Sequence, residues 1–306
     1  MLTVMPSPQS PRPWLPMPDT RPDARCRYLL LAWLVVAASP CLGAAPYFDT
    51  ELSYLHEDNF AHAAHASAAL DDDVLLARAS VNWLVPTSAR SGLLSSLAGE
   101  YQRYSRWQAL SRAALAGQLS YRYKPYAAFN APWLEANVSG ALRQFQDSSI
   151  RNGGRLAFEA ATGSALTDRI NVRLAYRFAL ERSWHEAVFD SDSHRVDGSV
   201  NWHTDRTTYY GMLAWQRGDT VSSVANTAEL NVVASARARD GALSDAAHSR
   251  RAYRLDADTL SATLGVNFAL AARLAVDVAA LYFDADSATG AHYRGYRVTA
   301  GLLYRF

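Results

Sequence analysis

A strict alternation of apolar and polar residues recurs along almost the whole chain and constrains its fold more than any other feature. In the last segment every even position is apolar: Tyr296, Val298, Ala300, Leu302, Tyr304 and Phe306. The positions between them include Arg297, Thr299 and Arg305. Successive side chains of a strand point to opposite faces, so this period of two predicts strands with one apolar face. The chain is expected to be all-β.

The alternating segments are long enough to cross a membrane. A tilted strand needs roughly 9 to 11 residues to cross a bilayer, whereas strands of soluble sheets usually have about 5 or 6. The expected strands are twelve: 47–57, 74–85, 93–106, 112–124, 133–145, 154–163, 169–181, 194–203, 207–217, 258–270, 272–284 and 293–306. Single-chain bacterial barrels require an even number. We therefore predict one transmembrane antiparallel up-and-down β-barrel of about 12 strands.

Alternation alone does not separate a soluble sandwich from a membrane barrel, but the first 44 residues favour export. Arg25 and Arg27 precede an apolar run from Tyr28 to Ala38, and small residues follow up to Ala44. The run is shorter than the roughly 20 residues that a transmembrane helix needs. We expect residues 1–44 to be a cleaved signal peptide and residues 45–306 to form the barrel.

Composition excludes several function classes. The 30 Lys and Arg residues balance 29 Asp and Glu, so bulk charge suggests neither nucleic-acid binding nor an acidic tail. Cys26 and Cys41 both lie in the expected signal peptide, so the mature chain should contain neither a disulfide nor a reactive thiol. No catalytic residue, metal ligand or cofactor is expected.

Connections between the expected strands alternate in length. Short connections occur at 87–91, 163–167, 204–206 and 271, and longer ones at 59–73, 183–193 and 219–257. In bacterial barrels short turns face the periplasm and long loops face outward. Both termini of the barrel are therefore expected on the periplasmic side.

Two short segments resemble known outer-membrane proteins. The final row that ends in Tyr304 and Phe306 resembles the carboxy-terminal signal recognised by the barrel-assembly machinery. Residues 52–60, LSYLHEDNF, look like the first strand of many proteobacterial porin-like barrels of unassigned function. The resemblance implies a bacterial outer-membrane location among lipid and lipopolysaccharide, and assembly by that machinery. It assigns neither a solute nor an oligomeric state.

If the apolar face contacts lipid, the other face lines the lumen. The charged residues expected there are Arg78, Glu100, Arg122, Glu135, Arg143, Arg155, Arg173, Arg177, Asp197, Asp277 and Arg297, with Asp49, Glu51, Glu159 and Arg195. Such charges either fill a narrow barrel as ion pairs or line an aqueous passage. Arg155, Arg173 and Arg177 form the densest basic strip. This strip is predicted to attract anions or, alternatively, to pair with Glu100, Glu135 and Asp277.

Aromatic and basic residues are expected where the barrel meets the two membrane surfaces. Rings near strand ends are predicted to lie at headgroup depth: Trp83, Trp107, Tyr123, Trp133, Trp202, Trp215 and Tyr304. The long 219–257 connection carries Arg237, Arg239, Arg250, Arg251 and Arg254, and alternation in 228–238 suggests strands projecting above the membrane. Guanidinium groups at this height suit lipopolysaccharide phosphates, or the loop folds into the lumen.

Enzymatic barrels are the main rivals to a channel. A lipid hydrolase needs an activated serine and a histidine in one site, but His194 and Ser193 are adjacent and face opposite sides of a strand. The residue two positions after His194 is Val196 rather than serine. The acidic run 71–73 is expected to be a solvated loop end rather than a calcium site. We predict a narrow porin-like channel, with a non-conducting structural or surface-interaction barrel as the alternative and a hydrolase third.

The loop pattern predicts an orientation that labelling can test. An epitope tag inserted near Ala66 or Ala242, in the long connections, should bind antibody on intact cells. The same tag at Ala89 should bind only after permeabilisation. The reverse labelling would show that the barrel has the opposite orientation.

Overall fold

A computed structural model describes residues 45–63, 69–224, 243–245, 250–287 and 290–306. The expected signal peptide 1–44 and the alternating segment 228–238 lie outside these residues. No helix within the described ranges is long and apolar enough to cross a membrane.

Strands make up nearly all of the described chain. They are β1 (Tyr47–Glu57), β2 (Asp72–Ser88), β3 (Ser91–Tyr104), β4 (Arg112–Tyr123), β5 (Trp133–Phe145), β6 (Gly153–Ala165), β7 (Ile170–Ser183), β8 (Ser191–His203), β9 (Thr207–Val224), β10 (Leu243–Asp245), β11 (Arg250–Ala271), β12 (Leu274–Ser287) and β13 (His292–Arg305). Three single-turn 3-10 helices, η2 (Gln108–Leu110), η3 (Ser149–Arg151) and η4 (Ala187–Phe189), lie in connections.

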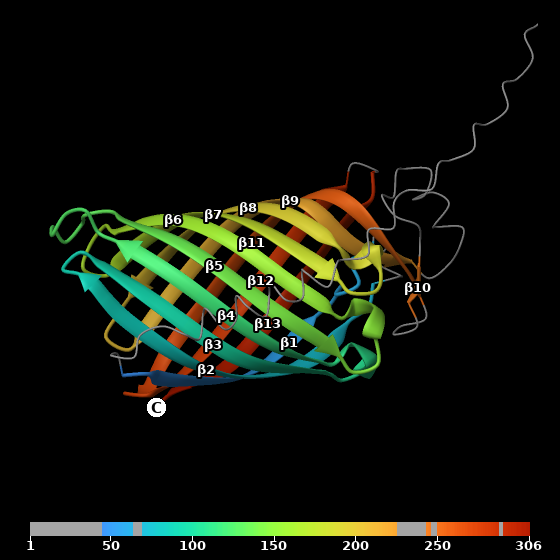
Figure 1. Ribbon diagram of the computed structural model, residues 1–306, viewed down its shortest axis with the longest axis horizontal. Helices are drawn as coiled ribbons and strands as arrows, with labels where there is room; N and C mark the ends of the chain where they lie inside the picture. Colours follow the sequence, from blue (N-terminus) through green and yellow to red (C-terminus); the bar gives the residue numbers. More distant parts are fainter. Residues whose placement is uncertain (1–44, 64–68, 225–242, 246–249, 288–289) are drawn as a thin grey trace, which may run out of the picture.

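The strands close into a barrel (Figure 1). Strands β1 to β9 pair antiparallel in chain order. Strand β9 then pairs with β11, β11 with β12, β12 with β13, and β13 returns to pair with β1. The short β10 pairs only with β11 and does not contribute to the ring. The prediction of an all-β, up-and-down barrel of twelve strands is confirmed, with β1 and β5 beginning and ending as expected.

Strands β9 and β11 are longer than predicted. They were expected at 207–217 and 258–270, but their ladder continues outward to the pair Arg251↔Val224. Strand β8 stops pairing with β9 at Ser193↔Gly218. Gly218 has a φ of +146°, and a Cβ there would lie 2.1 Å from the carbonyl oxygen of Asp192. A glycine is therefore needed where β9 separates from β8 and projects with β11.

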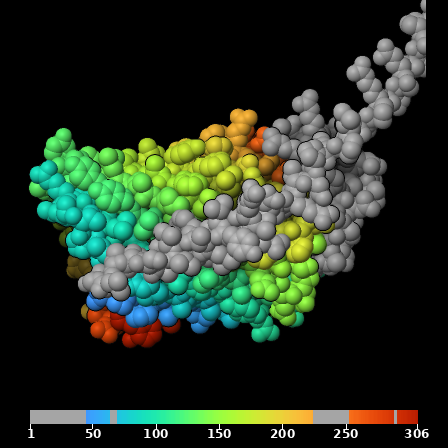
Figure 2. Space-filling model, in the orientation of Figure 1, coloured from blue at the N-terminus to red at the C-terminus, as the bar shows by residue number. Residues whose placement is uncertain are grey.

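The outward face of the barrel is apolar. Large exposed side chains on it include Leu52, Leu115, Leu174, Leu213, Leu260, Leu264, Val278, Val298 and Leu302, and Leu264 is 71% exposed. Where the space-filling view leaves them uncovered, the side chains of neighbouring strands pack side by side over the outside of the barrel (Figure 2). A closed barrel with an apolar outside and charged inside is arranged for lipid rather than water.

Aromatic side chains flank this apolar band. Exposed rings toward the loop end are Tyr54, Tyr101, Trp215, Tyr282 and Tyr296, and those toward the turn end are Tyr121, Tyr123, Trp202, Tyr209 and Tyr304. The prediction for Trp133 was wrong. This residue shares the inward face of β5 with Glu135, and the guanidinium of Arg122 lies 4.4 Å from its ring centroid. Trp107 immediately precedes η2 in a loop rather than ending a strand.

Connection lengths alternate between the two ends, except that 124–132 at the short-turn end is longer than 105–111, 146–152 and 184–190 at the other end. One end carries 89–90, 124–132, 166–169, 204–206 and 272–273, together with the start of β1 and the end of β13. The opposite end carries 58–71, 105–111, 146–152, 184–190 and the β9–β11 connection. In Figure 1 the chain end marked C and β10 accordingly lie at opposite ends of the barrel.

A pair of arginine substitutions tests which face contacts lipid. Val298 is exposed on the outward face of β13, whereas Thr299 belongs to the inward face. Val298→Arg should lower the free energy of unfolding in lipid vesicles by about 2 to 4 kcal/mol, because a guanidinium near mid-membrane loses its water. Thr299→Arg should cost much less, and equal costs would contradict the assignment of faces.

Candidate functional site: the barrel interior

All fifteen charged residues predicted to line the lumen lie on the strand faces opposite the apolar band. Residues directly opposite each other in a ladder share a face, and the ladder pairs Arg78 with Glu100 and Arg122 with Glu135. The remaining members follow the same parity around the ring.

The basic strip is bonded to carboxylates on its own and neighbouring strands. Arg173 bonds Glu159, and its Nη1 lies 3.1 Å from Asp197 Oδ2. Arg177 also bonds Glu159, and Arg195 Nε lies 3.4 Å from Asp197 Oδ1. The side chains of Glu159 and Asp197 are only 8% and 4% exposed. These are the actual partners, so the predicted pairing of the strip with Glu100, Glu135 and Asp277 was wrong.

Other interior charges are paired in the same way. Arg122 lies 2.6 Å from Glu135, and Arg297 lies 2.6 Å from Glu57. Asp277 instead accepts hydrogen bonds from neutral donors, the Tyr210 hydroxyl at 2.8 Å and Asn267 Nδ2 at 3.2 Å. Most carboxylates inside the barrel therefore lie within hydrogen-bond distance of an arginine or of a neutral donor.

The interior residues missed in the sequence include Arg112 at the start of β4 and Glu181 near the end of β7. Both have inward parity, so the alternation would have identified them. Glu181 accepts two hydrogen bonds of 3.1 Å from Arg143, and Arg155 Nε lies 3.5 Å from its Oε1. The carboxylate nearest to Arg112 belongs to Glu100, at 4.0 Å. The Nε atoms of Arg112 and Arg155 are buried and donate no hydrogen bond to the described residues, so these are weakly paired cations.

Three cavities follow one another along the interior. The outer cavity has a volume of about 590 Å³, the middle one about 610 Å³ and the one at the turn end about 430 Å³. Arg112, Arg143 and Arg155 line both the outer and the middle cavity. Arg78 lines both the middle cavity and the cavity at the turn end. Arginine side chains therefore line both junctions between neighbouring cavities.

The middle cavity carries an excess of positive charge. Its arginines are Arg78, Arg112, Arg143, Arg155, Arg173 and Arg177, and its carboxylates are Glu100, Glu135 and Glu159. Charges in a narrow space with low-dielectric walls interact more strongly than in bulk water. The wall of the middle cavity therefore presents more positive than negative side chains to a solute that enters it.

Residues 58–63, here called the mouth loop, cross the outer opening. The loop leaves β1 and reaches β9, which is separated from β1 by β13, β12 and β11. The Ser223 amide donates to the Ala61 carbonyl at 3.2 Å, and the Ser222 hydroxyl donates to the His62 carbonyl at 2.6 Å. At the other side, the Phe60 ring lies 6.0 Å from Tyr104 of β3.

His62 holds the centre of the mouth loop against the wall. Its Nδ1 donates to the Val221 carbonyl at 3.2 Å, and its ring stacks 5.3 Å from Tyr293. Burial lowers the pKa of its imidazole, so the ring is neutral at pH 7. The φ of +50° at His62 is a left-handed conformation that non-glycine residues seldom adopt. The loop is therefore held by specific contacts.

The residues considered for hydrolysis and calcium binding serve other purposes. His194 hydrogen-bonds the Tyr176 hydroxyl at 2.7 Å on the outward face, whereas Ser193 lines the outer cavity, so they form no dyad. In the acidic run, Asp72 accepts the amides of Arg106 and Trp107, both at 3.0 Å. Asp71 lies 2.6 Å from Arg106. The run holds the β3–β4 loop in place.

Solved structures with a similar fold are outer-membrane barrels. The COG4313 outer membrane channel from Pseudomonas putida F1 aligns with a TM-score of 0.55 and 11% identity, over 88% of this chain and 99% of that chain. A KdgM porin in complex with disordered oligogalacturonate aligns at 0.44 and 14% identity, over 84% and 99%. A NanC porin aligns at 0.45 and 9%, over 84% and 98%.

No family model matches the sequence, and no curated protein matches it. The likeness to solved structures shows the fold alone. It is the fold of a porin-like outer-membrane β-barrel, and the apolar outward band agrees with it. The closed barrel and its apolar outward band suit a bilayer, and the similar channel from Pseudomonas putida F1 is an outer-membrane protein.

Removing an interior arginine should reveal how strongly the network holds the barrel together. Arg173 bonds two almost fully buried carboxylates, each of which keeps a second arginine, so Arg173→Gln should reduce the unfolding free energy by about 2 to 3 kcal/mol, measured by urea titration in lipid vesicles. Arg122 is 59% exposed beside one carboxylate, so Arg122→Gln should cost about 0 to 1 kcal/mol. Equal small losses would mean that water solvates Glu159 and Asp197.

Proposed function

We propose that this protein is a narrow outer-membrane channel for small solutes and that it prefers anions. The observation that carries the proposal is the series of three cavities that share arginines where they meet. A charged wall in a confined aqueous space raises the local concentration of counter-ions. Rings of charged side chains select ions by the same means in known pores.

The mouth loop supports a restricted solute size. It lies across the outer opening, and its buried residues Asn59, Ala61 and Ala63 occupy space that a solute would otherwise use. A solute must therefore pass beside the loop through the outer cavity. The similar protein from Pseudomonas putida F1 is described as an outer membrane channel, which agrees with this role.

A non-conducting barrel is the second candidate, and the same interior supplies the argument for it. Short ion pairs join β6, β7 and β8 through Glu159 and Asp197, and the mouth loop narrows the entrance. If these contacts exclude water, the charges stabilise the barrel without conducting. Conductance decides between the two candidates.

Export and assembly complete the proposal. We propose that residues 1–44 are removed after export and that the outward row ending in Tyr304 and Phe306 is recognised by the barrel-assembly machinery. The Phe306 amide donates to the Phe48 carbonyl at 2.9 Å, and its ring lies 4.7 Å from that of Tyr304. These contacts support an exposed, ordered aromatic pair at the turn end of the barrel.

Planar-bilayer recording of the refolded protein tests the channel. Stable unitary currents with a reversal potential on the anion side are expected in a salt gradient. Changing Arg112 and Arg155 together to Gln should move the reversal potential by several millivolts toward cation preference. Folding should survive, because Glu181 keeps its bonds from Arg143 and Glu100 keeps its 2.8 Å hydrogen bond from Gln102.

A matched variant separates lumen charge from total charge. Arg103 is exposed on the outward face of β3, so Arg103→Gln removes one positive charge without altering the interior. Its reversal potential should equal that of the unmodified protein. Absence of unitary currents from folded protein would reject the channel in favour of the non-conducting barrel. An unmoved reversal potential in the double variant would reject the anion preference.

A further inference from the structure

Two backbone hydrogen bonds join the described residues on either side of the β12–β13 connection. The Ser287 amide donates to the Ala291 carbonyl, and the Gly290 amide donates to the Ser287 carbonyl, both at 2.9 Å. Gly290 has a φ of +78°, which suits a residue without a side chain. Side chains on the last ladder pairs below this turn are consequently held in a defined register.

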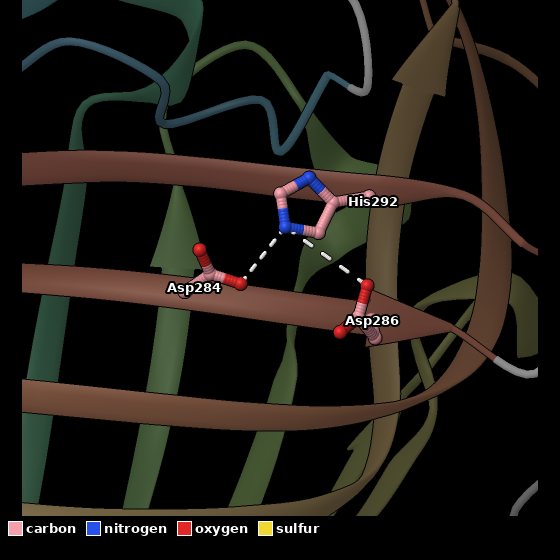
Figure 3. A group of neighbouring side chains, drawn as sticks. All are labelled: Asp284, Asp286 and His292. Carbon is pink, nitrogen blue, oxygen red and sulfur yellow. Dashed lines mark hydrogen bonds and ion pairs between the residues drawn. The ribbon is translucent and has the colours of Figure 1, made fainter.

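Three potential metal ligands gather on the outward face of this hairpin. Asp284 and Asp286 are two residues apart on β12, so they point to the same side, and His292 is directly opposite Asp286 in the ladder. Figure 3 shows both carboxylates beside the imidazole of His292. The group lies beyond the exposed Tyr282↔Tyr296 pair, toward the outer end of the barrel. It is separate from the lumen and independent of the proposed channel.

The distances suit a bound ion. His292 Nε2 lies 2.9 Å from Asp284 Oδ1 and 3.9 Å from Asp286 Oδ1, and one donor atom from each residue lies within 4.8 Å of the others. A tetrahedral metal about 2.0 to 2.1 Å from each ligand places those ligands roughly 3.4 Å apart. The two observed distances bracket this value. Asp286, at 78% exposed, is free to adjust.

The orientation of Asp284 is a second observation in favour of a ligand role. Arg294 is directly opposite Asp284 in the ladder, where a guanidinium would ordinarily pair with a carboxylate. Instead, Oδ1 of Asp284 faces His292, and Oδ2 accepts a hydrogen bond from the Tyr282 hydroxyl at 3.3 Å. Ion pairs found among the described residues do not join Asp284 to Arg294. A hydrogen bond to the second oxygen is how metal-binding carboxylates are commonly oriented.

We propose that Asp284, Asp286 and His292 form a divalent transition-metal site that joins β12 to β13 at the outer surface. When Nε2 of His292 carries a proton, it cannot donate that proton equally to two carboxylates. When Nε2 is deprotonated, its lone pair and two carboxylate oxygens together suit a cation. An imidazole in the set favours zinc and similar metals over magnesium or calcium. Three protein ligands leave a fourth position for water.

Zinc titration of the refolded, chelator-treated full chain tests the site. Calorimetry at pH 7.5 should detect one Zn²⁺ per chain. Binding should weaken when the pH is lowered to 5.5, because metal ligands must be deprotonated to bind the ion. Cobalt should give the visible absorption of a tetrahedral complex at the same stoichiometry.

Two variants distinguish a metal site from a plain ion pair. Asp286→Asn leaves the 2.9 Å contact between His292 and Asp284 in place, yet it should weaken zinc binding at least tenfold. His292→Gln should abolish binding. Folding of each variant is checked by its heat-modifiable mobility on gels.

A matched control exists on the neighbouring strands. His56 and Asp73 form a similar outward pair, with a 2.8 Å contact, but among the residues that the structure describes no second carboxylate joins them within ligand distance. His56→Gln should therefore bind zinc with unchanged affinity and stoichiometry. The proposal is overturned if the folded protein binds no zinc, if binding survives either Asp286→Asn or His292→Gln, or if His56→Gln removes it.

Discussion

The pairing of β1 with β13 is the interaction on which the whole structure depends. Within hydrocarbon an unpaired backbone amide costs several kcal/mol, so a sheet crossing a membrane is stable only when it has no edge. The ladder from Asp49↔Arg305 to Glu57↔Arg297 supplies this closure between strands at opposite ends of the chain. All other features, from the apolar band to the charged lumen, follow from a ring of twelve strands closed in this register.

Because the sheet closes, half of the side chains point into a narrow interior, where charges interact strongly. Register then decides their partners, because residues opposite each other in a ladder share a face. Glu159 is opposite Arg177, and Arg122 is opposite Glu135, so ion pairs form between adjacent strands. Arginines outnumber carboxylates in the middle cavity, and the weakly paired Arg112 and Arg155 contribute to the excess of positive charge from which anion preference is inferred.

The outer end of the barrel combines two independent systems. On the inside, the mouth loop brings His62 from the β1 side to Val221 of β9 and narrows the entrance. On the outside, Asp284, Asp286 and His292 face away from the lumen. Because successive residues of a strand point to opposite faces, the two systems lie on opposite sides of the barrel wall. The proposed channel and the proposed metal site can accordingly be tested separately.

Alternation along the chain was sufficient to predict the twelve strands, the ends of β1 and β5, and the inward parity of the charged residues. It would also have placed Trp133 inside, since this residue shares parity with Glu135. Partner choice was decided by tertiary structure: Arg173 bonds Glu159 and Asp197, and Arg297 meets Glu57 only because the ring closes. The sequence pattern did not predict the path of the mouth loop either. A period of two describes local strand geometry, whereas contacts across the barrel depend on register and loop path between distant segments.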